Sequence, residues 1–102
     1  MGSIGDNKLG GWISYRASKA ATNMLVRCAA IELRARNVGV IALHPNLVDT
    51  ALSQPITQNS PNKFTPLTPD QSAAMLHDVC DTAVAEQRTG VFLDYEGKEI
   101  EW

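Results

Sequence analysis

The chain contains Tyr15-Arg16-Ala17-Ser18-Lys19 at the start of a helical pattern. In an α-helix, positions i and i+4 lie on the same face, one turn apart. The phenol of Tyr15 and the ammonium of Lys19 are therefore expected to lie side by side. A neighbouring positive charge favours the ionised form of a phenol, so this spacing suits a tyrosine that exchanges a proton near neutral pH. The stretch indicates acid–base chemistry at the beginning of a helix.

The helix that carries this pair is predicted to run from Ile13 to Arg36. Small and apolar residues recur in it with a period near 3.6, which predicts a wide stripe packed against a sheet; they are Ala17, Ala20, Ala21, Met24, Leu25, Cys28, Ala29, Ile31 and Leu33. Asn37 is expected to end the helix in the left-handed conformation.

Two strands and a second helix are predicted after the first helix. The continuous apolar run Val38–Leu43 is typical of a parallel strand buried on both faces, and the proline of His44-Pro45 ends it. Gly90–Asp94 is predicted to be the second strand. The resulting order of helix, strand, long loop, helix and strand indicates an α/β fold.

The second helix has a clear start signal. Thr68 is a suitable N-cap, Pro69 fits the first helical position, and Gln71 completes a capping box. The long loop before it, Ala51–Leu67, exceeds the usual length of a connection in a compact domain, which is typical of a substrate lid or of a mobile connector.

The composition is that of a soluble globular piece. Hydrophobic residues make up 44% of the chain and the net charge is −2, so no nucleic-acid or membrane partner is expected. No apolar run has the length of a membrane span and no signal sequence is recognised, so a cytoplasmic location is expected. Cys28 and Cys80 are expected to be buried, reduced thiols. His77 with Cys80 offers only two ligands, so no metal site is expected.

The flanks of the Tyr15–Lys19 stretch add further motifs in a fixed order. They are Gly2-Ser3-Ile4, Gly10-Gly11-Trp12, the Pro45–Thr50 segment and the ending that runs from Gly90 to Trp102. Together they resemble the C-terminal half of the short-chain dehydrogenase/reductases, in the C-factor-like and sniffer-like carbonyl reductase branch. The resemblance covers essentially all 102 residues.

The resemblance implies a fold that is the C-terminal portion of a Rossmann-like, doubly wound parallel sheet. Residues 1–102 then form a single partial domain. Family members open with a glycine-rich turn after a strand, which binds the dinucleotide pyrophosphate, and this chain contains no such turn. The nucleotide-binding N-terminal half is therefore expected to be absent.

The resemblance also assigns chemistry to particular residues. It makes Tyr15 the general acid/base for a carbonyl or alcohol substrate, and Lys19 its partner, which also bonds the ribose of NAD or NADP. Ser3, twelve positions before Tyr15, is the candidate for a hydrogen bond to the substrate oxygen. An ordinary loop serine that makes a turn is the other interpretation of Ser3, and both stay open.

A second cofactor segment is implied after the first strand. Pro45, Asn46, Leu47, Val48 and Thr50 resemble the family segment that lies over the nicotinamide. Asn46 stands where the family usually has glycine. Asparagine tolerates a positive φ better than other non-glycine residues, so the turn is expected to survive.

Two functions from different classes are compatible with these residues. The first is an NAD(P)-dependent oxidoreductase acting on a small carbonyl or alcohol, with little turnover by this chain alone. The second is a non-catalytic remnant or interaction module. It would associate through the Ile13–Arg36 helix or an open sheet edge, with a second copy or a full-length relative.

Overall fold

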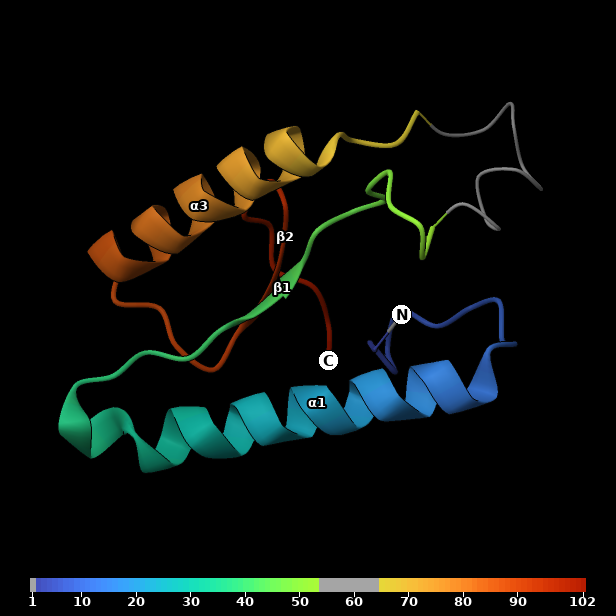
Figure 1. Cartoon of the computed structure of the whole chain (residues 1–102). Helices are drawn as coiled ribbons and strands as arrows, with labels where there is room; N and C mark the ends of the chain where they lie inside the picture. Colours follow the sequence, from blue (N-terminus) through green and yellow to red (C-terminus); the bar gives the residue numbers. More distant parts are fainter. Residues whose placement is uncertain (1, 54–64) are drawn as a thin grey trace.

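The structure, a computed structural model, describes residues 2–53 and 65–102. Two helices lie on opposite sides of a two-stranded sheet (Figure 1). The elements in chain order are α1 (Ile13–Glu32), the short 3₁₀ helix η1 (Arg34–Arg36), β1 (Ala42–His44), α3 (Pro69–Ala85) and β2 (Phe92–Asp94). The predicted order of helix, strand, helix and strand is confirmed. Residues 54–64, most of the predicted Ala51–Leu67 loop, lie outside the described part of the chain.

Helix α1 is shorter than predicted, because its last turn tightens into η1. The Arg36 amide donates to the Leu33 carbonyl and the Asn37 amide donates to the Arg34 carbonyl, both at 3.0 Å. Such i→i+3 bonds commonly satisfy the carbonyls at a helix end. Asn37 follows with φ of 57°, so the predicted left-handed stop is confirmed.

The two strands pair in parallel, with Ala42, Leu43 and His44 opposite Phe92, Leu93 and Asp94. Both strands start later than the predicted Val38–Leu43 and Gly90–Asp94. Ahead of the ladder, the Val40 amide donates to the Thr89 hydroxyl at 3.0 Å, so a side chain replaces a strand partner. Gly90 has φ of 69°, which breaks the extended backbone before Val91.

Helix α3 begins as the sequence predicted. The Thr68 side chain accepts from the Gln71 amide at 3.1 Å, and the Gln71 side chain accepts from the Thr68 amide at 3.0 Å, with Pro69 in the first turn. These bonds satisfy two amides that the helix itself leaves unpaired.

A return segment at residues 98–100 covers the outer edge of β2. Asp94 organises the turn, because one of its carboxylate oxygens accepts from the amides of Glu96 and Lys98. The Ile100 amide then donates to the Phe92 carbonyl at 2.8 Å. The edge of β1 that faces away from β2 has no strand partner within residues 2–53 and 65–102. Among the described residues, this is the open sheet edge that the sequence predicted.

The core is small and lies between the helices and the strand pair. It consists of Ala30, Ala42, Val79, Ala83, Phe92 and Leu93. The predicted wide buried stripe on α1 is wrong for most of its residues. Met24, Leu25, Cys28 and Ile31 are exposed, whereas Asn23 and Ala30 are the buried residues of this helix.

One narrow face of α1 therefore contacts the rest of the described chain. The expectation of two buried thiols is corrected accordingly: Cys28 is exposed and Cys80 is half-buried, and both are unpaired. No helix among the described residues is long and apolar enough to span a membrane.

Candidate functional site

Tyr15 and Lys19 meet at the start of α1. The Lys19 ammonium lies 5.5 Å from the centre of the Tyr15 ring, and Tyr15 is 37% exposed to solvent. Trp12 packs edge-on against the same ring, with the ring centres 6.4 Å apart. The local helical spacing thus produces a phenol that is reachable from solvent and has a cation beside it.

The first turn of α1 has no side-chain cap. Its N-cap residue is Trp12, which adopts a left-handed conformation with φ of 53° and makes no capping hydrogen bond. Support comes instead from the preceding loop, because the Arg16 side chain donates to the Gly11 carbonyl at 2.9 Å.

Ser3 is buried, and its hydroxyl is hydrogen-bonded to groups other than Tyr15 and Lys19. Its hydroxyl donates to the Glu101 carbonyl and accepts from the Asp6 amide, the latter at 3.0 Å. Among the described residues, no hydrogen bond or ring contact joins Ser3 to Tyr15 or Lys19. The bond from Asp6 is the turn that the structural interpretation of Ser3 expected.

The segment after β1 turns where the sequence predicted. Asn46 has φ of 65°, the conformation for which glycine is usually required. Further along, Leu47, Val48 and Asp49 run beside Leu67: the Leu67 amide donates to the Leu47 carbonyl at 2.9 Å, and the Asp49 amide donates to the Leu67 carbonyl at 2.8 Å.

Two serine side chains form hydrogen bonds with the backbone of the Pro45–Thr50 segment. The Ser72 hydroxyl donates to the Pro45 carbonyl at 3.4 Å, and Ser53 accepts from the Thr50 amide at 3.1 Å. The backbone from Pro45 to Thr50 is thereby fixed at both ends.

The two groups of candidate residues lie at the same end of the molecule. The start of α1 and the chain leaving the carboxyl end of β1 are on one side of Figure 1, opposite the η1 end. In open α/β sheets, ligands bind beyond the carboxyl ends of the strands. The segment Pro45–Thr50 and the Tyr15–Lys19 pair are thus on the same side, although no hydrogen bond or ring contact joins them among the described residues.

His44 is the titratable group with a shifted pKa nearest this end. Partial desolvation lowers the pKa of His44 below its ordinary value, against the opposing effect of the Asp94 and Asp6 carboxylates. The ring is consequently neutral at pH 7.

Sequence reasoning missed a cluster that closes the loop before α1 against the C-terminal segment. The amides of Ile4 and Gly5 both donate to the Trp102 carbonyl at 3.0 Å. The Trp102 ring stacks on Phe92, with ring centres 5.7 Å apart, and the Arg27 guanidinium lies 5.6 Å from its centre. We call this set of contacts, together with the Ser3–Glu101 bond, the terminal clasp.

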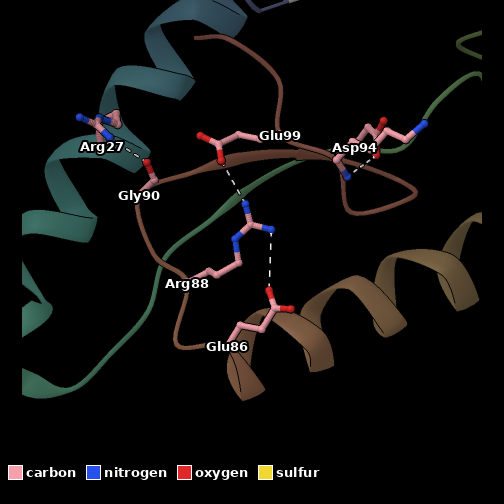
Figure 2. A network of polar contacts seen from close by, with 7 residues as sticks. Arg27, Glu86, Arg88, Gly90, Asp94 and Glu99 are labelled. Carbon is pink, nitrogen blue, oxygen red and sulfur yellow. Dashed lines mark hydrogen bonds and ion pairs between the residues drawn. The ribbon is translucent and has the colours of Figure 1, made fainter.

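Arg27 links the terminal clasp to the sheet. Its guanidinium donates to the Gly90 carbonyl at 2.8 Å, and Figure 2 shows this side chain reaching from α1 to the chain before β2. A separate ion-pair group appears in the same view, where Arg88 contacts Glu99 at 3.1 Å and Glu86 at 3.9 Å. The sequence held one signal for Arg27: Tyr15, Lys19, Asn23 and Arg27 recur every four residues on one face.

Two other surface features lie apart from this end. A hollow of about 280 Å³ between α3 and the turn after β2 includes none of the candidate residues; Met75, Val79, Ala83 and Leu93 form its apolar part. On the exposed face of α3, His77, Asp78 and Asp81 hold ligand atoms within 4.8 Å of one another. Exposed acidic groups often cluster without a metal, so these three residues do not define a site.

Comparison with known proteins identifies the family. The sequence profile described as short chain dehydrogenase matches residues 2–61, more than half of the chain. The chain therefore belongs to the short-chain dehydrogenase family. It is 38% identical over 102 residues to the 1-hydroxy-2-glutathionyl-2-methyl-3-butene dehydrogenase of a Rhodococcus species, covering 100% of this chain and 43% of that protein. Over the same length it is 35% identical to the C-signal protein of Myxococcus xanthus, covering 56% of it.

Two solved structures share the fold. The NADPH-bound carbonyl reductase from chicken fatty liver is 34% identical with a TM-score of 0.75; the match covers 99% of this chain and 39% of that one. The carbonyl reductase Sniffer of Drosophila melanogaster is 28% identical with a TM-score of 0.82, covering 99% and 37%. The predicted branch and the predicted Rossmann-type α/β fold are confirmed. The chain spans between 37% and 56% of the length of these four relatives.

Proposed function

We propose that this chain is the catalytic part of an NAD(P)-dependent oxidoreductase that interconverts a carbonyl and an alcohol. The observation that carries the proposal is the Tyr15–Lys19 pair, in which the ammonium lies 5.5 Å from the ring centre at the exposed start of α1. The Tyr15 hydroxyl would donate a proton to the substrate oxygen in reduction and accept it in oxidation. General acid–base catalysis of this kind contributes about 10²–10⁴-fold.

The residues present are chemically suited to the nicotinamide end of the cofactor. Lys19 offers an ammonium to the ribose hydroxyls, and the turn at Asn46 begins the segment that would lie over the carboxamide. Thr50 adds a hydroxyl and Pro45, Leu47 and Val48 complete the segment. The bound dinucleotide would supply the hydride. The Ser3 hydroxyl is hydrogen-bonded to the Asp6 amide and the Glu101 carbonyl, so the proposal rests on Tyr15 and Lys19.

We further propose that the 102-residue chain alone has little turnover. A dinucleotide needs a glycine-rich turn and a helix N-terminus for its pyrophosphate, and the sequence contains no such turn. A second function, a non-catalytic interaction module, is favoured by the exposed apolar side chains Met24, Leu25 and Ile31 on α1. Exposed apolar surface of this kind commonly marks an interface.

A graft separates the two functions. Residues 2–102 would replace the matching segment of the chicken carbonyl reductase, and NADPH-dependent reduction of simple ketones and aldehydes would be measured. We expect the graft to be active, and Tyr15→Phe to lower kcat by about 10² or more. The matched control is Tyr95→Phe, in the turn after β2, which should leave kcat unchanged.

The outcome of the graft is informative in either direction. A graft that keeps its helical circular dichroism but is inactive, or in which Tyr15→Phe and Tyr95→Phe behave alike, would reject the catalytic proposal and leave the interaction module. For the isolated chain, the fluorescence of Trp12 titrated with NADPH should not change at micromolar concentrations.

A further inference from the structure

We propose that Ser3 is a positioning residue: its hydroxyl closes the terminal clasp, and the terminal clasp holds the loop that supports the Tyr15–Lys19 turn. The significance of this role for catalysis rests on the proposed function. The contacts that carry it are independent of the reaction.

Ser3 has both of its hydrogen-bonding roles filled. The side chain is only 7% exposed, its proton goes to the Glu101 carbonyl, and its oxygen accepts the Asp6 amide. A hydroxyl has one proton to donate. Donation to a substrate oxygen would therefore require the bond to the Glu101 carbonyl to break.

The residue before Ser3 packs directly on α1 beside the catalytic pair. A Cβ atom placed on Gly2 would lie 2.9 Å from the Lys19 carbonyl oxygen and 3.0 Å from the Asn23 amide nitrogen. Only a residue without a side chain permits this approach. The Asn23 side chain is 9% exposed and its amide nitrogen has no hydrogen-bond partner, so this part of the helix face is closed over by the Gly2 segment.

The same loop returns to α1 near Tyr15. The Asn7 side chain accepts from the Gly10 amide at 3.1 Å, and the Gly11 carbonyl accepts from the Arg16 guanidinium. The loop is thus held at three places: on α1 at Lys19, on the C-terminal segment at Glu101, and on α1 again at Arg16. Because Trp12 provides no side-chain cap, this anchored loop is the support of the first turn.

Amide hydrogen exchange of the full chain tests the proposal. In Ser3→Ala, the amides of Ile4, Gly5 and Asp6 should exchange faster, because the terminal clasp opens. The amides from Arg16 to Lys19 should follow, by about three- to tenfold, which is what the loss of one hydrogen bond produces in an opening equilibrium. Ser3→Thr keeps the hydroxyl and should restore exchange close to that of the unmodified chain.

Controls separate this local effect from a general loss of stability. Ser72→Ala removes another buried serine hydroxyl, whose bond to Pro45 is long at 3.4 Å, and should leave the Arg16–Lys19 amides unchanged. Gly2→Ala leaves the hydroxyl in place but forces the segment off α1, and should reproduce the Ser3→Ala pattern.

Two results would overturn the proposal. One is unchanged exchange at Arg16–Lys19 in both Ser3→Ala and Gly2→Ala. The other is an equal increase in Ser3→Ala and Ser3→Thr, which would mean that the hydroxyl is irrelevant. Neither result bears on the kcat of Tyr15→Phe in the graft, so failure of this proposal and failure of the proposed function are distinguishable.

Discussion

Replacement of Trp102 by alanine should destabilise the chain more than its position at the end of the described residues suggests. The Trp102 ring stacks on the buried Phe92 with an interplanar angle of 28°. The Arg27 guanidinium also lies over the Trp102 ring, 5.6 Å from its centre. A ring pair contributes about 0.5–1.5 kcal/mol beyond its buried area. An exposed cation–π contact contributes about 0.5–1 kcal/mol.

The lost burial adds to these two contributions. Replacing a fully buried tryptophan by alanine lowers the free energy of unfolding by about 3–5 kcal/mol. Because Trp102 is only half-buried, its replacement should cost a part of this amount. We expect Trp102→Ala to lower the free energy of unfolding by about 2–3 kcal/mol. The assay is urea denaturation followed by far-ultraviolet circular dichroism, which does not depend on tryptophan fluorescence.

Trp12 provides the matched control. It is 58% exposed and contacts only the edge of the Tyr15 ring among the aromatic side chains described, so Trp12→Ala should cost less than about 1 kcal/mol. Equal losses in Trp102→Ala and Trp12→Ala would refute the reasoning, because they would mean that the stack on Phe92 and the contact with Arg27 contribute nothing.

Three further substitutions probe the core, a helix start and a titratable group. Leu93 is 1% exposed between the helices, so Leu93→Ala should lower the free energy of unfolding by about 2–5 kcal/mol in the same urea assay; a loss below that of Trp12→Ala would contradict the assigned core. Thr68→Ala removes the N-cap of α3 and should cost about 1 kcal/mol, whereas Thr68→Ser should keep most of it. The pKa of His44 is lowered in the folded chain, so the neutral ring contributes stability that is present above the unfolded value of about 6.5 and is lost as the pH falls through the folded value. His44→Gln should therefore make stability less sensitive to acid below pH of about 6.5, and an unchanged pH profile would show that His44 does not contribute.

Features that depend on nearby residues were predictable from the sequence. The capping box at Thr68, the left-handed stop at Asn37, the positive φ of Asn46 and the meeting of Tyr15 with Lys19 each involve residues no more than four apart. Their causes are hydrogen bonds and backbone sterics within one turn, which act in the same way in any fold.

Features set by distant parts of the chain were not predictable. The Ser3–Glu101 bond joins residues 98 positions apart, and nothing local to Ser3 distinguishes it from a serine at a catalytic site. The buried face of α1 was placed on Met24 and Leu25, because periodicity identifies apolar positions, whereas burial depends on what packs there. Asn23 is buried since the Gly2 segment lies on it, which only the folded arrangement reveals.

The terminal clasp also bears on the order in which the molecule folds. Closing a loop that spans almost the whole chain carries a large entropic cost, and long-range contacts of this kind form slowly. During synthesis, the loop before α1 emerges long before Trp102, the residue whose carbonyl accepts from the amides of Ile4 and Gly5. Helix α1 can form early from local interactions, but its Tyr15 turn receives its final support last. A nascent chain interrupted before Trp102 would thus carry the residues of the acid–base pair without the scaffold that holds them.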